Sequence, residues 1–294
     1  MIKSHSDLLS AYESGRHHCQ RIIKNAGSTG DTHWLDWAFA SGQPAYDARI
    51  GTALALNPIV AVGNDAIYFP PIPADHTRHL HRITMRPQAN NASQASINFA
   101  LYDLVAVYPL IDGDSIDPQE MDNTLALPRY ADGAGLRLIM VNHVAPGVQT
   151  GRMVLEYTDG DGVDRSADLG VPNLGVNKCV SGVQASTAST TGPLFLSLEG
   201  AGVQRVNRIT YTVPPGGLHC IYVVKPLAQF THWHDALLQA DTTGVKSAIE
   251  VDLAVKDGWR LPVIKDGAHL GFFYSPNGGG RTVAMFGDLT FIWA

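Results

Sequence analysis

The feature that most constrains the fold is a succession of short segments rich in Val, Ile, Tyr and Phe, which Gly, Pro, Asn and Asp separate. Segments of this length and composition are typical of β strands. The turns "YTDGDGVD" (157–164) and "YSPNGGGR" (274–281) place Gly and Asn where tight hairpins require positive φ. The sequence therefore predicts an all-β chain of antiparallel β-sandwiches. The candidate strands are residues 65–69, 82–87, 97–110, 136–144, 151–158, 207–213, 218–227, 268–275 and 289–294.

A clear helical pattern occurs near the N-terminus, in "SHSDLLSAYESGRHH" (residues 4–18). Ser4 or Ser6 can cap the first turn, and Gly15 can end the helix. The segment 33–55 that follows holds aromatic residues, Gly and Pro without periodicity. It predicts an extended arm or an irregular loop.

The two halves of the chain contain three similar sequences in the same order. "HRITMRPQ", "LVAVYPL" and "LPRYADGAG" in the first half correspond to "NRITYTVP", "IYVVKPL" and "LPVIKDGAH" in the second. Insertions in surface hairpins cost little, so unequal separations are compatible with a repeat. The separation is 126 residues for Ile83 and Ile209, 117 for Pro109 and Pro226, and 134 for Pro128 and Pro262.

This repetition favours an internal duplication with two similar, jelly-roll-like β-sandwiches. The expected organisation is a helix and arm over residues 1–55, one sandwich over 56–182 and a second over 183–294. The boundary is expected near "VQASTASTTG" (183–192), a stretch of small and polar residues. The alternative is that β proteins share short apolar sequences by chance.

Composition excludes several classes of function. Charged residues make up only 16% of the 294 residues and the net charge is −6, with no run of Lys or Arg that would form a nucleic-acid surface. No apolar stretch has the length of a signal peptide or a membrane span, so we expect folding in a cytoplasm without a membrane partner. A surface with so few charges suits a component of an assembly.

The chain contains one set of residues that resembles a serine-esterase site. Asp266 and His269 form Asp-x-x-His, and "GDS" occupies residues 113–115. However, the esterase fold is α/β with its Ser after the first strand, and Asp132 matches Asp266 in the other half where Gly135 replaces His269. Turn chemistry explains the Asp better. We therefore predict no catalytic residue, no cofactor and no enzyme activity.

Histidines occur in two clusters, His76, His79 and His81 in "DHTRHLHR", and His232 and His234 in "HWHD". Alternate histidines in a strand point to one face, as a metal site requires. Neither cluster has the partners of a known zinc site, so a histidine-rich edge is the preferred interpretation and no metal is predicted. A metal and a pH-sensitive contact stay open as alternatives.

Two further motifs have structural explanations. The loops "DGDSID" (112–117) and "DGDGVD" (159–164) alternate Asp as calcium loops do, but they lack the Glu that completes an EF-hand, so hairpin turns are expected. Cys19, Cys179 and Cys220 lie far apart and predict buried free thiols.

Several stretches resemble a type of virion structural protein of tailed bacteriophages. They are "SDLLSAYESGR", "FALYDLVAVYP" and above all residues 125–169, and the resemblance covers about half of the chain. The matching pattern has Leu-Pro-Arg and Gly-x-Gly, followed by a strand ending in Tyr-Thr, a Gly-containing turn and an Arg. Its residues here are Leu127, Pro128, Arg129, Gly133, Gly135, Tyr157, Thr158, Gly160, Gly162 and Arg165.

The resemblance implies a β-sandwich protein on the capsid surface of a virion, as a decoration or cement protein or another head-associated part. Its expected partners are the major capsid protein and copies of itself, with a homotrimer at local three-fold positions as one arrangement. Many weak contacts would stabilise the shell through avidity. Assembly would take place in the host cytoplasm. Trp34, Trp37 and Tyr46 of the arm are candidate interface anchors.

A second class of function stays open, a receptor- or carbohydrate-binding module of a phage tail. In that case Trp34, Trp37, Trp233 and Trp259 would be platforms on which sugars stack. Aromatic residues of a core or an interface are the alternative. Affinity for glycans in the free protein would distinguish the two classes.

Overall fold

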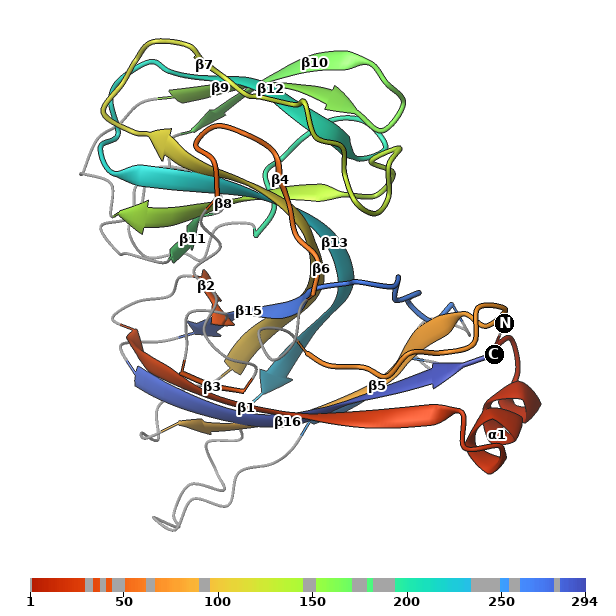
Figure 1. The fold of residues 1–294 in the computed structure, drawn as a ribbon. Coiled ribbons are helices and arrows are strands. Elements are labelled where there is room, and N and C mark those ends of the chain that lie inside the picture. The colour runs from red at the N-terminus through yellow and green to blue at the C-terminus, as the bar shows by residue number, and fades with distance from the viewer. Residues whose placement is uncertain are drawn as a thin grey trace.

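The computed structural model describes residues 2–29, 34–37, 41–43, 51–61, 67–89, 96–144, 152–170, 179–181, 194–233, 249–253, 260–277 and 281–294. Antiparallel strands dominate these residues (Figure 1), which confirms the all-β prediction. No helix in this part of the chain is long and apolar enough to cross a bilayer. The elements are α1 (His5–Glu13), β1 (His17–Thr29), β2 (Trp34–Asp36), β3 (Ser41–Gln43), β4 (Asn57–Pro58), β5 (Arg78–Ala89), β6 (Ser96–Asp112), β7 (Gln119–Glu120), β8 (Arg137–Val144), β9 (Arg152–Asp159), β10 (Asp164–Gly170), β11 (Cys179–Ser181), β12 (Val203–Tyr211), β13 (Leu218–Trp233), β14 (Ile249–Asp252), β15 (Leu270–Asn277) and β16 (Arg281–Trp293).

Helix α1 forms where the sequence predicts it. The Ser4 hydroxyl accepts a hydrogen bond from the backbone N–H of Asp7 at 3.2 Å, which caps the first turn. Ser14 is the C-cap of the helix, and Gly15, with a φ of 67°, follows it. Leu8 and Ala11 are buried against the lower half of the molecule.

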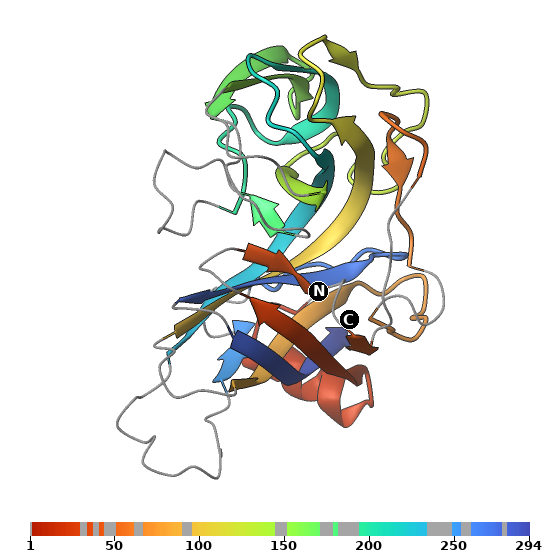
Figure 2. The same cartoon turned by 90° about the vertical axis from the view of Figure 1, so that its left-hand side faces the viewer.

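Two long strands, β6 and β13, run through both halves of the molecule (Figures 1 and 2). They pair with each other from Leu218↔Asp112 to Trp233↔Ser96. In the upper half of Figure 1, β8 extends this central sheet beside β13, and the upper sheet β10-β9-β12-β7 faces it. In the lower half, β15 extends it beside β6, and the lower sheet β14-β5-β16-β1-β3 faces it. The protein therefore consists of two sandwiches that share one bent central sheet.

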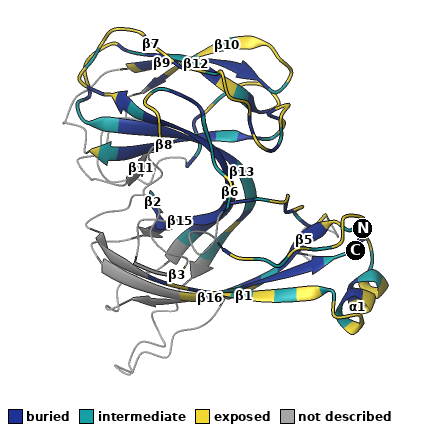
Figure 3. Ribbon diagram, viewed as in Figure 1, coloured by how far each residue is buried: buried dark blue, intermediate teal, exposed yellow. Residues whose placement is uncertain are grey.

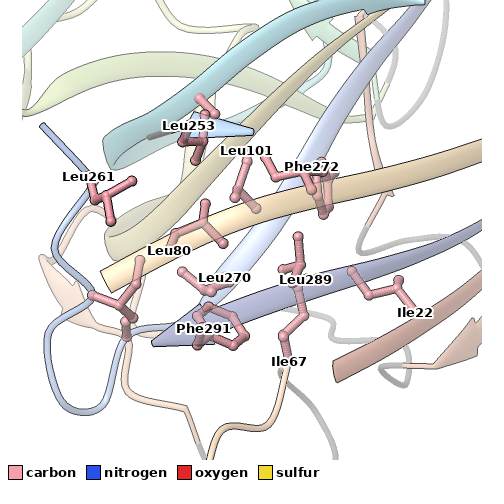
Figure 4. Packing of buried hydrophobic residues seen from close by; sticks show 14 of the residues in the cluster. Ile22, Ile67, Leu80, Leu101, Leu253, Leu261, Leu270, Phe272, Leu289 and Phe291 are labelled. Carbon is pink, nitrogen blue, oxygen red and sulfur yellow. The ribbon is translucent and has the colours of Figure 1, made fainter. Parts of the chain in front are cut away.

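Each sandwich has its own apolar core, and Figure 3 shows buried residues along strands of both sandwiches. In the lower core, Leu80, Leu289 and Phe291 of the lower sheet pack against Leu101 and Phe272 of the central sheet (Figure 4). Complete burial of such a side chain contributes roughly 1.5–3 kcal/mol. Burial of these apolar side chains is the main source of stability of the two sandwiches.

Strand β6 serves both cores because its facing changes along its length. Phe99 and Leu101 contact the lower core, with the strand spacing of two, whereas Tyr108 and Ile111 contact the upper core with a spacing of three. The ladder with β13 shifts register at three places, and Leu110 has a positive φ of 59°. Such irregularities rotate a strand about its axis. They let one strand bury residues in two different sandwiches.

The observed pairing does not divide the chain into the expected successive sandwiches at 56–182 and 183–294. Both β6 and β13 belong to both sandwiches, β5 pairs with β16, and β9 pairs with β12. In addition, β1 lies within the expected helix and arm (1–55) but is a full strand of the lower sheet. The expected boundary stretch 183–192 lies outside the described residues.

The strand order nevertheless has an internal correspondence. In the first series, β5 lies in the lower sheet, β6 and β8 lie in the central sheet, and β7 and β9 lie in the upper sheet. In the second series the two outer sheets are exchanged, so β12 lies in the upper sheet, β13 and β15 in the central sheet, and β14 and β16 in the lower sheet. The last strand of each series pairs with the first strand of the other, β9 with β12 and β16 with β5. The third member of each series also pairs with that strand, β7 with β12 and β14 with β5.

The registers of the outer sheets correspond as well. In the ladder of β9 with β12, one residue of β12 is skipped between the partners of Glu156 and Tyr157. In the ladder of β16 with β5, one residue of β5 is skipped at the equivalent place, between the partners of Thr290 and Phe291. Strands β12 and β5 correspond at the separation of 126 residues found in the sequence, and β9 and β16 at the separation of 134. In contrast, the register of β8 against β13 does not correspond to that of β15 against β6. The corresponding pairs are Leu155↔Ile209 with Leu289↔Ile83, Glu156↔Arg208 with Thr290↔Arg82, and Tyr157↔Val206 with Phe291↔Leu80. The pairing agrees with a duplication, which stays a prediction about the origin of the chain.

Candidate functional site

Of the three aromatic residues that the sequence indicates as interface anchors, the structure describes two, and it places them against different cores. Trp37 is only 2% exposed, and its ring lies edge-on to Phe272 at 5.2 Å in the lower core. A buried side chain of this kind stabilises its own sandwich and is not presented to another subunit. Trp34 is partly buried against the core residues of the central sheet, and Tyr46 lies outside the described residues.

The first histidine cluster is also dispersed. His81 is buried, and its Nδ1 lies 2.9 Å from the Tyr12 hydroxyl and its Nε2 lies 3.5 Å from Asp252. His79 is buried as well, and burial lowers the pKa of both imidazoles. His76 contacts Asp75 at 2.9 Å near the surface.

No group of three His, Cys, Asp or Glu side chains in the described part of the chain could hold a metal ion. The His232 side chain and the whole of His234 lie outside the described residues. The histidines therefore contribute packing and hydrogen bonds where the structure describes them.

The residues of the esterase-like pattern have other contacts. Asp266 accepts a hydrogen bond from Arg78 at 3.2 Å, with its own side chain 90% exposed. The backbone N–H of His269 donates to Asp103 at 2.9 Å. Asp132, the match of Asp266, accepts from the backbone N–H of Ala134 as turn residues do.

The two Asp-rich loops are turns. Asp112 accepts from the backbone N–H of Asp114 at 2.8 Å. In the β9–β10 hairpin, the Asp159 carboxylate accepts from the backbone N–H groups of Asp161 and Val163 and pairs with Arg165. The prediction of hairpin turns is confirmed at residues 159–164.

A buried ion pair joins the two sandwiches. Arg129 donates to both carboxylate oxygens of Asp103, at 3.0 and 2.7 Å, and also to the carbonyls of Ile59 and Leu104 at 2.8 Å. The backbone N–H of His269 completes the shell of Asp103. The pair thereby connects β6, the segment before β8 and the segment before β15. Its position inside the protein makes it a structural element.

The outer face of the lower sheet carries a groove of about 440 Å³. Its apolar members, Phe286 and Ile23, are 40% and 37% exposed. The residues that line it are Arg21 and Ile23 of β1, Thr84 and Arg86 of β5, and Phe286, Gly287 and Asp288 of β16. We call this surface the open groove.

The open groove carries an excess of positive charge. Arg21 lies 3.5 Å from Asp288, but these side chains are 76% and 38% exposed, so the contact is weak. Arg86 is exposed and forms none of the ion pairs found among the described residues. A basic groove on a chain with a net charge of −6 attracts acidic groups.

The equivalent face of the upper sheet differs, although the two ladders share a register. The counterpart of Phe286 is Arg152, which lies 2.5 Å from Asp168. Arg208 likewise bridges Glu156 and Glu120. Ion pairs thus cover the upper face, so an exposed Phe is not a requirement of this sheet geometry.

One edge of the lower sheet lies beside the open groove. The carbonyl of Arg16 accepts from the backbone N–H of Trp293, and hydrogen-bonded pairs alternate along an antiparallel ladder. The backbone groups of His17, Cys19 and Arg21 therefore point away from β16. Among the described residues, β3 pairs with β1 only from Ile23 onward. In the described part of the chain, no strand pairs with this side of β1 over residues 17–21, which we call the free edge.

A second, smaller groove of about 210 Å³ lies on the upper sandwich. Leu125, which is 56% exposed, and Leu127 are among its lining residues, together with Arg205. Like the open groove, it is lined by apolar residues and an Arg, and it lies on the other sandwich, so a substitution in it can serve as a control.

Sequence reasoning missed the open groove and the free edge. Residues His17, Cys19, Arg21 and Ile23 of β1 alternate outward, but the inward positions include Gln20 and the buried Lys24. The inward positions are therefore not consistently apolar, and the sequence of β1 lacks the alternation of apolar and polar residues by which a half-buried strand is recognised.

Comparisons with known proteins assign no family. No family model and no curated protein matches the chain. Solved structures with partial similarity include that of the infectious bursal disease virus Gt strain, at 11% identity and a TM-score of 0.19, over 94% of this chain and 80% of that chain. T=1 particles derived from infectious bursal virus give 9% identity and a TM-score of 0.20, over 94% and 77%. Similarities this low assign neither fold nor role.

Proposed function

We propose that the chain is a non-enzymatic structural protein of a virus particle, and more finely a decoration or cement protein of a tailed bacteriophage. In this role it binds the assembled capsid shell from the outside and stabilises it. Its partners are the major capsid protein and other copies of itself, with a homotrimer as one arrangement. It uses no cofactor and no nucleic acid.

The observation that carries the proposal concerns the residues that resemble virion structural proteins. Arg129 forms the buried ion pair, and Gly133 and Gly135 have φ angles of 70° and 68°. A Cβ atom at Gly133 would lie 2.5 Å from the Val203 backbone. Tyr157 donates to the carbonyl of Glu199 at 3.1 Å. The resemblance therefore lies in residues on which the fold of the upper sandwich depends, and such a resemblance reports shared architecture.

The expected result is that the purified protein binds expanded, undecorated heads of the phage that encodes it. Binding only to the assembled state stabilises that state, by about 2.7 kcal/mol per site at a free concentration of 100 times Kd. Co-sedimentation measures saturation, and calorimetry of the heads measures the rise in the Tm of the shell.

The same experiment includes glycan-bearing host envelopes as a second target. Sedimentation with the envelopes and not with the heads would replace the proposal by the tail-associated receptor-binding module. The burial of Trp37 removes one of the four residues on which that alternative relied.

A further inference from the structure

We propose that the open groove and the free edge together form the surface that binds the capsid shell. The occupant is an extended, acidic segment of the shell protein, which pairs with β1 as an additional strand. This inference rests on the proposed function and names the partner chemistry of the protein within it.

The free edge provides the backbone part of this recognition. Unpaired N–H and C=O groups on an edge strand accept another strand, and main-chain hydrogen bonds then give affinity. The carbonyl of Arg21 accepts a hydrogen bond from the side-chain amide of Gln20 at 2.9 Å. An incoming strand would replace that exposed side-chain contact with a backbone bond. The added strand would cover β1 from His17 to Arg21 and end where β3 begins.

The open groove provides the side-chain part. Residues of an added strand lie about 5 Å from their neighbours across the ladder, so a carboxylate opposite Arg21 would strengthen the weak pairing there. Residues that continue beyond the strand reach Phe286 and Ile23, which offer apolar surface, and Arg86, which lacks an ion-pair partner among the described residues. Both charge and shape therefore favour an acidic, extended segment over a compact basic one.

The comparison inside the molecule gives the second, independent support. The upper sheet shares the ladder register of the lower sheet, yet Arg152 occupies the position of Phe286 and is ion-paired. The fold is thus compatible with a charged, closed face at this position. Among the described residues of the two outer sheet faces, an exposed Phe beside a cation without an ion-pair partner occurs on the lower face, as expected of a surface that a partner covers.

The first test removes one edge N–H. Cys19→Pro deletes a backbone donor that points to solvent, a position where sheets accept Pro, and Cys19→Ser is the matched control that keeps the donor. We expect Cys19→Pro to weaken co-sedimentation with undecorated heads by about tenfold or more, and Cys19→Ser to bind as the unchanged protein does. Circular dichroism and the Tm of each variant establish that the fold is retained.

The second test changes the groove without touching the edge. Phe286→Ala removes the exposed aromatic surface without adding a charge, and Leu125→Ala makes the same kind of change in the smaller groove of the upper sandwich. We expect a loss of binding of about tenfold or more for Phe286→Ala alone. Arg86→Glu should weaken binding as well, and most at low salt, where charge contributes most. An array of overlapping peptides from the shell protein should bind through its acidic members.

The outcomes separate the two proposals. If the unchanged protein binds heads and both Cys19→Pro and Phe286→Ala bind equally well, the surface is refuted and the decoration role stands. If the unchanged protein does not bind heads, the decoration role fails, and the surface falls with it. Binding of basic or neutral peptides in preference to acidic ones would overturn the proposed chemistry.

Discussion

Replacing Arg129 by Met is expected to lower the free energy of unfolding by about 3–5 kcal/mol. The change leaves the Asp103 carboxylate inside the protein, where its side chain is 1% exposed, without its cation. The carbonyls of Ile59 and Leu104 lose their donors at the same time. A loss of this size is a large fraction of the stability of an ordinary domain. Urea denaturation followed by circular dichroism measures it.

Two further variants identify the cause. Combining Asp103→Leu with Arg129→Met removes the buried charge and should restore part of the loss, because an apolar pair needs no ionic partner. Arg152→Met breaks an ion pair whose side chains are 56% and 58% exposed, so we expect little change. Equal losses for Arg129→Met and Arg152→Met would show that burial of the pair is not what matters.

The ion pair also illustrates what sequence reasoning could predict about this fold. The segments around Asp103 and Arg129 were expected as strand and turn, and the structure contains them there. Their partners were not predictable, because 26 residues separate the two side chains and no local pattern links them. In the matching segment of the second half, Val263 stands where Arg129 stands in the first. The repeat therefore indicated similar backbones without indicating the contact.

Strand segments were predictable because alternation and turn residues are local properties. One exception is the expected strand at 65–69, whose described residues Ile67, Tyr68 and Phe69 are irregular. Ile67 is buried in the lower core and the Phe69 ring lies 5.7 Å from that of Phe291, both from a loop, whereas Tyr68 is exposed. Tertiary packing outweighs strand propensity here.

The way in which the strands combine was not predictable. Matching sequences suggested two successive sandwiches, but β6 carries residues of two cores, and its facing changes at irregularities that no sequence pattern reveals. For the same reason, the candidate surface escaped prediction. Its residues come from β1 and β5 in the first third of the chain and from β16 at its other end, and only the pairing brings them together.

Acidification is expected to destabilise the protein well above the pH at which carboxylates titrate, through its buried histidines. Burial lowers the pKa of His219 from 6.5 to about 4, and its Nδ1 lies 2.9 Å from the Asn142 amide oxygen. The native state therefore favours neutral His219, whereas the unfolded chain takes up a proton near pH 6.5. Stability from this group is complete above pH 6.5 and falls until about pH 4. The full loss is about 3 kcal/mol. The lowered pKa values of His79 and His81 act in the same direction.

His219→Gln tests this cause, because Gln has no proton to take up in this range. Between about pH 7.5 and 4.5, urea denaturation should show a smaller loss of stability for the variant than for the unchanged protein. Val223→Ala, at a buried position of the same strand, lowers stability without changing titration and should lose as much on acidification as the unchanged protein does. An equal loss for His219→Gln would mean that other groups control the acid transition.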